Sequence, residues 1–234
     1  MKDPYVYEGT NVLINLARIK DQNKLDDFES TFVQAAVINL SRTFISTGSA
    51  KDIFIIHKEL FKEIYAWAGE KRTINVIKRE PVLGGESVIY IDKDYINVDI
   101  EKLDRKIESI NWDAISFEDK ISETADIISE LWRIHPFREG NTRAVSVFLY
   151  YFMKDKGLAL NNEFISEHAK YFRNALVLNS LDENSNPEPL RAILKDAATD
   201  APLQEDSKDK YGTINGYDLK DYRYDYHSSN ERME

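Results

Sequence analysis

Apolar residues recur at the three- and four-residue spacing of amphipathic helices along most of the chain. This spacing predicts helices over residues 25–40, 52–67, 100–110, 121–134, 145–152, 164–178 and 190–198. Gly69 and Gly157 follow two of these segments, where a glycine commonly ends a helix. The pattern therefore predicts a mainly α fold.

Two of the expected helices have features that place them in the core. The predicted buried face of the first one is traced by Leu25, Phe28, Phe32, Ala36, Asn39 and Leu40. The dense apolar content of residues 52–67 suggests a central buried helix. We expect His57 within it to be a hydrogen-bonded structural residue rather than a base, and His168 to lie at the surface.

The period changes between residues 73 and 91. Two β-branched runs flank Pro81 and the pair Gly84-Gly85, which predicts a single β-hairpin and no larger sheet. A lone hairpin is weakly stable unless it packs on something. It is either a surface decoration or an element that covers a site.

A helix, a short polar loop and a second helix are predicted around residues 134–148. Pro136 ends the first helical pattern, because proline lacks an amide hydrogen and disfavours helical geometry in the residue before it. Gly140 and Asn141 then mark a tight turn. The loop between the helices concentrates polar side chains.

The chemistry of this loop points to phosphate. The first amides of the second helix, near Gly140, lack intrahelical acceptors, so they form an anion site that Arg143 can strengthen. Glu139 is a hard oxygen ligand of the kind that Mg²⁺ takes, and His135 suits a general base near neutral pH. The alternative is a polar corner with a capping Asn141 and a solvated Arg143.

Composition narrows the function classes. The 31 basic and 41 acidic residues give 31 − 41 = −10, which argues against a surface that tracks nucleic-acid phosphates. Cysteine is absent, so disulfides and thiolate metal sites are excluded. No apolar run approaches membrane-spanning length, and the N-terminus resembles no signal peptide. We expect a soluble cytoplasmic protein.

The composition shifts near residue 199. Residues 1–198 are expected to form the folded domain with an N-terminal helical arm, and residues 199–234 a polar, tyrosine-rich tail. The chain has no internal repeat.

Residues 135–143, H-P-F-R-E-G-N-T-R, resemble the signature of Fic domains, His-x-Phe-x-(Asp/Glu)-Gly-Asn-x-Arg. The resemblance extends upstream to H-x-x-L-F-x-x-I-Y-x-W-A-G at residues 57–69 and covers roughly residues 5–198. It implies a Fic-type helical bundle in which the hairpin is a flap whose edge can align a target segment.

The resemblance also implies roles for individual residues. His135 would be the base that activates a target hydroxyl, Glu139 would bind Mg²⁺, and Gly140, Asn141 and Arg143 would hold the nucleotide phosphates. The other nucleotide-binding candidates are Thr142, Ser146, Lys78, Tyr171 and Asn174. Of these, Lys78 resembles a flap position that approaches the nucleotide, while Tyr171 and Asn174 either line an adenine pocket or serve the core or surface.

Two positions depart from the family pattern. Thr142 stands where the family usually has glycine, or lysine in a phosphotransferase branch, and Ser146 stands where a second arginine is often found. That arginine is associated with the γ-phosphate. The inhibitory motif (Ser/Thr)-x-x-x-Glu-(Gly/Asn) is also absent. We therefore expect either a small helical inhibitor or antitoxin partner, or an enzyme that is uninhibited.

The resulting hypothesis is a Mg²⁺-dependent protein adenylyltransferase, which moves AMP from ATP to a hydroxyl side chain of a target protein. In-line attack at the α-phosphorus needs a base, a metal and phosphate donors, and the loop offers each of them. The alternatives are transfer of another phosphate-containing group, including phosphoryl transfer, and a nucleotide-binding module without turnover.

Overall fold

The computed structural model describes residues 3–42, 47–181 and 185–199. The tail expected at residues 199–234 therefore lies outside this part of the chain, apart from Thr199. The proposed division into a domain and a tail stays a prediction.

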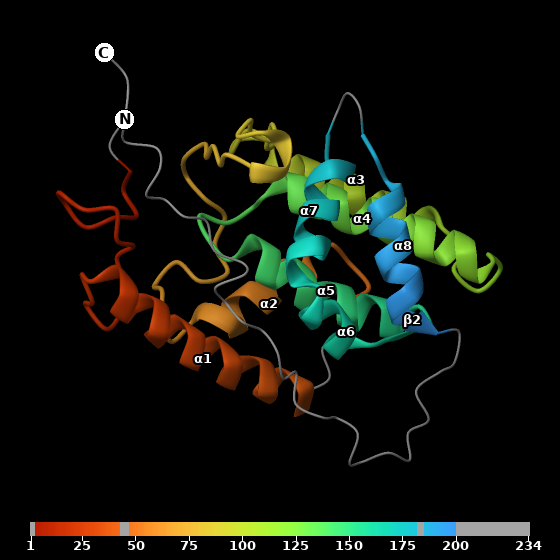
Figure 1. Ribbon diagram of the computed structural model, residues 1–234, viewed down its shortest axis with the longest axis horizontal. Coiled ribbons are helices and arrows are strands. Elements are labelled where there is room, and N and C mark those ends of the chain that lie inside the picture. Colours follow the sequence, from red (N-terminus) through yellow and green to blue (C-terminus); the bar gives the residue numbers. More distant parts are fainter. Residues whose placement is uncertain (1–2, 43–46, 182–184, 200–234) are drawn as a thin grey trace.

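The described residues form a mainly helical fold, as the sequence predicts (Figure 1). Its helices are α1 (Gln22–Arg42), α2 (Asp52–Phe61), α3 (Ile96–Ser109), α4 (Phe117–Ile134), α5 (Asn141–Asp155), α6 (Asn162–Glu167), α7 (Ala169–Asn179) and α8 (Glu188–Ala197). Side-chain caps begin three of them: the Asp21 carboxylate accepts from the amide of Lys24, the Ser116 hydroxyl from the amide of Asp119, and the Asn161 side-chain oxygen from the amide of Phe164.

Helix α5 is the centre of the bundle (Figure 1). Most of its residues are buried, from Asn141 to Met153, and it packs against α2 on one side and α4 on the other. Helix α1 lies against α2, while α7 and α8 pack on α4. The helix expected to be central and buried over residues 52–67 is α2, which lies between α1 and α5 and has one buried face. Helix α2 stops at Phe61 and leaves Ile55 53% exposed.

The predicted buried face of α1 is wrong by about one position. The buried residues are Leu25, Glu29, Val33, Val37 and Leu40. Phe32 is 37% exposed, and Phe28 and Phe32 contact each other at the margin with ring centroids 4.4 Å apart. The two phenylalanine rings cover part of each other's surface at the edge of the helix. The aliphatic residues of α1 therefore form the stripe that is buried in the core, where α1 packs against α2. The carboxylate of Glu29 is carried into the core with that stripe.

Residues 73–91 form a flap rather than a regular hairpin. One antiparallel bridge joins Arg79 and Ser87, and the tip is the short 3-10 helix η1 (Pro81–Leu83). A two-stranded sheet not predicted from the sequence pairs β1 (Ala159–Leu160) with β2 (Ala198–Thr199). Each of these strands has only two residues, which is too short for a sequence pattern.

The helix expected over residues 164–178 is two helices. His168 separates α6 from α7, and its Nδ1 donates to the carbonyl of Phe164, 2.9 Å away. The side chain is exposed, as predicted. No glycine or proline lies at this break, and the helical spacing of apolar residues continues across it. The sequence pattern therefore predicted one helix.

Within residues 3–42, 47–181 and 185–199, no helix is both long enough and apolar enough to cross a membrane. The cytoplasmic location stays a prediction.

Candidate active site

Helix α4 ends at Ile134, and the next residue begins the loop with an unusual backbone. His135 has a φ of 49°, in the left-handed region that non-glycine residues seldom adopt. Buried Arg72 holds this turn, because its Nε donates to the carbonyl of His135 and its backbone amide donates to the carbonyl of Pro136, each at 2.8 Å. The loop is therefore fixed from outside α4.

The hydrogen bonds of His135 decide which ring nitrogen carries the proton. Nδ1 lies 3.2 Å from the carbonyl oxygen of Trp132, which can only accept, so Nδ1 is the donor. Nε2 is buried and has no hydrogen-bond partner among the described residues. Burial lowers the pKa of His135 well below its ordinary value, and the nearby Lys78 cation lowers it further. The imidazole is neutral, with a lone pair on Nε2.

Asn141 ties the two ends of the loop together. Its side-chain oxygen accepts from the amide of Phe137 at 2.9 Å, and its side-chain nitrogen donates to the carbonyl of the same residue at 2.8 Å. Gly140 precedes it with a φ of 82°, and a Cβ there would lie 2.5 Å from the ring of Phe61. Only glycine fits, and the turn aims the first amides of α5 at the loop.

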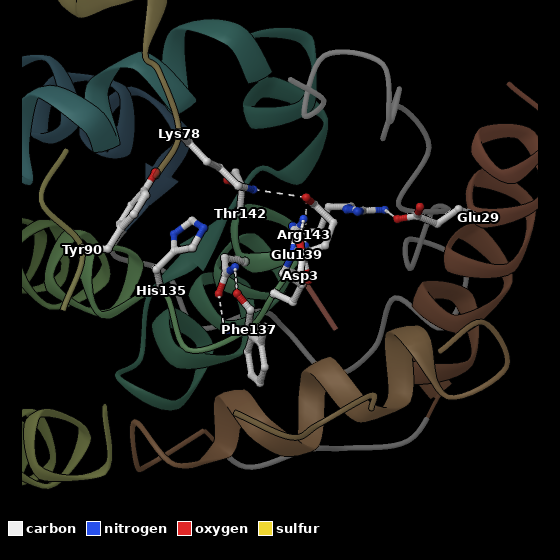
Figure 2. Close-up of polar contacts among 12 residues, drawn as sticks. Asp3, Glu29, Lys78, Tyr90, His135, Phe137, Glu139, Thr142 and Arg143 are labelled. Atoms are coloured by element: carbon white, nitrogen blue, oxygen red, sulfur yellow. Dashed lines mark hydrogen bonds and ion pairs between the residues drawn. The ribbon is translucent and has the colours of Figure 1, made fainter. Parts of the chain in front are cut away.

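Glu139 lies above this helix N-terminus (Figure 2). Its Oε1 accepts from the amide of Gly140 at 3.0 Å, and its Oε2 lies 3.2 Å from Nζ of Lys78. Burial alone would raise the pKa of Glu139, but Lys78, Arg143 and the Gly140 amide together hold it well below its usual range. The carboxylate is ionised.

Arg143 is paired with a residue from the other end of the domain. Its NH1 forms an ion pair with Oε1 of Glu29 on α1, and both side chains are only 5% exposed (Figure 2). The Tyr65 hydroxyl donates to the other oxygen of Glu29 at 3.0 Å, and the guanidinium lies over the Phe61 ring at 4.7 Å. Burial would lower the pKa of Arg143, but Glu29 and Glu139 raise it above its ordinary value.

Removing Glu29 should destabilise the protein strongly. Glu29→Ala leaves the Arg143 cation buried without this partner, a change that typically costs about 3–5 kcal/mol. We expect urea unfolding to show that loss. The matched control is Glu59→Ala, which breaks an exposed pair with Lys62 and should cost less than about 1 kcal/mol. Equal stabilities for the two variants would contradict the assignment.

His57 supports the loop from α2, in the structural role expected for it. Its Nδ1 accepts from the amide of Gly69 at 2.9 Å, so Nε2 carries the proton and donates to the carbonyl of Glu139 at 3.0 Å. The ring stacks on Phe137 with centroids 3.7 Å apart, and burial lowers its pKa to about 3. His57 has both nitrogens occupied, in contrast to His135.

The remaining candidate residues divide into two groups. Thr142 and Ser146 are buried, and their hydroxyls bind inside the protein: Trp132 Nε1 donates to Thr142 Oγ1, and Ser146 Oγ donates to the Thr142 carbonyl, each at 2.9 Å. Tyr171 is 49% exposed on α7, and Asn174 is partly exposed one turn later. No contact described in the structure joins these two to the loop.

The structure adds residues that the sequence reasoning missed. Asp3 accepts from Nε and NH2 of Arg138 at 2.9 and 2.8 Å, Glu29 pairs with Arg143, and the ring of Tyr90 stacks on His135. Glu29 could have been found as a carboxylate in the stripe Leu25, Val33 and Val37. Asp3 and Tyr90 carry no comparable sequence signal, since tertiary packing alone brings them to the loop.

The loop thus brings together an unpaired imidazole nitrogen, an ionised carboxylate and a helix N-terminus. Arg143, Lys78 and Arg138 surround it, each next to a carboxylate. Such a site can accept a proton and hold an anion at short range.

The sequence of this chain is similar to those of known proteins. "Protein adenylyltransferase VbhT" of Bartonella schoenbuchensis is 33% identical over 156 residues, which are 66% of this chain and 31% of that protein. The chain therefore spans less than a third of that relative. "Probable protein adenylyltransferase y4lH" of Sinorhizobium fredii is 28% identical over 179 residues, 76% of this chain and 88% of that protein.

Solved structures share the fold. The BepC protein of Bartonella tribocorum, solved with bound AMPPNP, has a TM-score of 0.70 at 22% identity and covers 86% of this chain and 97% of its own. The N-terminal FIC domain of Bep8 from Bartonella sp. 1-1C has a TM-score of 0.72 at 23% identity, with 83% and 94% covered.

The part of the chain that matches a known family includes the residues that form the site. Residues 47–153 match the Fic/DOC family, and this range contains α2, the flap, the His135 loop and all but the last two residues of α5. The motif, the fold and the relatives agree with this match, so residues 47–153 of the chain are a Fic/DOC domain.

Proposed function

We propose that this protein is a Mg²⁺-dependent adenylyltransferase, which transfers AMP from ATP to a hydroxyl side chain of a target protein. The observation that carries the proposal is the free Nε2 of neutral His135 beside the N-terminus of α5. The names of the relatives, protein adenylyltransferases, agree with it.

In the proposed reaction, Nε2 of His135 takes the proton of the target hydroxyl as its oxygen attacks the α-phosphorus. The oxygen–phosphorus bond to the target forms, the bond between the α-phosphorus and the bridging oxygen breaks, and pyrophosphate leaves. The α5 amides near Gly140 and the Arg143 guanidinium hold phosphate oxygens. Arg143 comes to this task already oriented by Glu29.

The residues present fit a Mg²⁺ ion that is shared with the nucleotide. No group of three or more acidic, His or Cys side chains gathers for a metal in the described parts of the chain, so a cage made of protein alone is not expected there. Mg²⁺ in nucleotide sites is typically bound by one or two carboxylates plus phosphates, and ionised Glu139 supplies one. When bound, the ion would neutralise charge that develops on pyrophosphate. The Lys78 cation lies next to the same carboxylate.

Label transfer from ATP separates this function from the alternatives. The protein is incubated with lysate and Mg²⁺, once with α-labelled and once with γ-labelled ATP. We expect label on protein from the α-position alone. Label from the γ-position would indicate phosphoryl transfer, and label from neither would indicate a binding module without turnover.

Ser146 offers a test of how the triphosphate is held. If a missing γ-phosphate contact limits binding, Ser146→Arg should tighten ATP more than ADP in calorimetry, because only ATP has that phosphate. Ser146→Gln, of similar length but neutral, is the control for a long side chain at this buried position. Equal tightening of ATP and ADP by the arginine would refute this role.

The target is a protein with an accessible Ser, Thr or Tyr hydroxyl, in the cytoplasm. A small helical antitoxin or inhibitor partner is proposed because the inhibitory motif is absent from the sequence.

A further inference from the structure

The flap alternates between an inner and an outer side. Lys78, Glu80, Val88 and Tyr90 are buried or turn inward, while Ile77 and Ile89 are 80% and 76% exposed. This is the two-residue period of extended chain. Of the inner side chains, Tyr90 stacks on His135 and the Lys78 cation lies near it, and Figure 2 shows both next to the imidazole.

Two aromatic rings enclose the His135 imidazole. Tyr90 stacks on it with centroids 4.0 Å apart and an angle of 29° between the planes. Trp132 meets it edge-on at 5.6 Å and also meets Tyr90 edge-on at 5.6 Å. The hydrogen bond from Nδ1 to the Trp132 carbonyl restricts rotation of the His135 imidazole. The Tyr90 ring, stacked on the imidazole, prevents it from moving toward the flap.

Tyr90 is itself held by a buried charge pair. Its hydroxyl donates to Oε1 of Glu80 at 3.2 Å, and NH2 of Arg173 on α7 lies 3.1 Å from both oxygens of that carboxylate. Glu80 is 1% exposed and Arg173 8%. A buried ion pair is weak evidence for stability, because desolvation offsets much of its attraction. Because Glu80 belongs to the flap and Arg173 to α7, the pair ties the flap to α7, and the hydrogen bond to Glu80 holds Tyr90 there.

We propose that Tyr90 is a positioning residue for His135, and that the Glu80–Arg173 pair locks Tyr90 in place from α7. The flap then sets the direction of Nε2 in addition to covering the site. The kinetic part of this inference rests on the proposed function, while the positioning itself can be measured without turnover.

The positioning is measured by NMR of histidine-labelled protein without nucleotide. A stacked tyrosine shifts the imidazole protons upfield, and His135→Asn identifies the His135 signals by their disappearance. Tyr90→Phe should keep the shift, whereas Tyr90→Leu should abolish it. Glu80→Gln and Arg173→Met should reduce it with the ring of Tyr90 still present, so they decide the matter even if Tyr90→Leu does not fold.

The kinetic arm separates positioning from nucleotide binding. Misplacing a reacting group by about 1 Å can cost on the order of 10²-fold, so Tyr90→Leu should lower kcat by about that factor with the KM for ATP changed less than about twofold. Tyr90→Phe should restore most of the rate. The same change at Tyr95, which is 62% exposed, is the control and should leave kcat unaltered.

The results distinguish the two proposals. An unchanged His135 signal in Tyr90→Leu, Glu80→Gln and Arg173→Met would overturn the positioning role, whatever the enzyme does. A raised KM for ATP with an unchanged kcat would overturn it too, because Tyr90 would then serve nucleotide binding. A wild-type protein that transfers no label would refute the proposed function, and the NMR comparison would still decide the role of Tyr90.

Discussion

His135→Ala is expected to lower the rate of AMP transfer by roughly two to four orders of magnitude, the usual contribution of a general base. The physical reason is the state of the imidazole. It is neutral and donates from Nδ1, and it leaves Nε2 as the acceptor for the hydroxyl proton. ATP affinity in calorimetry should change little, since the α5 amides and Arg143 are proposed to hold the phosphates.

A second substitution guards against a backbone effect. His135 has a φ of 49°, a conformation that asparagine tolerates better than alanine does. His135→Asn should therefore fold at least as well as His135→Ala, yet it cannot take up the proton. Wild-type turnover in either folded variant would show that another group is the base.

Glu139→Ala should remove most of the activity and its dependence on Mg²⁺. Neutralising charge on the leaving pyrophosphate is worth several kcal/mol, which corresponds to roughly 10²-fold or more in rate. The measurement is the initial rate as a function of Mg²⁺ concentration. The wild-type curve should rise to saturation, and the variant curve should stay low and flat.

Glu139→Gln refines this test. It keeps an oxygen that can accept from the Gly140 amide, so the loop should remain folded, but it removes the charge that pairs with Lys78 and that is proposed to bind Mg²⁺. Superimposable Mg²⁺ titrations for wild type and Glu139→Gln would rule out Glu139 as the metal ligand.

The parts of the fold that sequence alone predicted are governed by local rules. The α4–loop–α5 unit follows from helical spacing, the proline and glycine breaks, and the need for glycine at residue 140, where a Cβ would strike Phe61. Most of the polar residues predicted for this unit do lie together in its loop. Composition and periodicity were sufficient to predict this unit because its residues are continuous in the chain.

The parts that failed depend on distant partners. Glu29 lies in the buried stripe of α1, but its partner Arg143 is identified only when α1 packs against α2 in the folded protein. The buried face of α1 was predicted along Phe28 and Phe32, whereas the core takes Val33 and Val37 one position further on. Tyr90 reads as an ordinary strand residue, and only the closed flap stacks it on His135.

The measurement that tests the central claim most directly is mass spectrometry of the protein that becomes labelled. After reaction with ATP and Mg²⁺, we predict one added AMP on a Ser, Thr or Tyr hydroxyl of that protein, and none when His135→Asn replaces the wild type. An added phosphate without the nucleoside, or an AMP adduct of equal yield from His135→Asn, would contradict adenylyl transfer by His135.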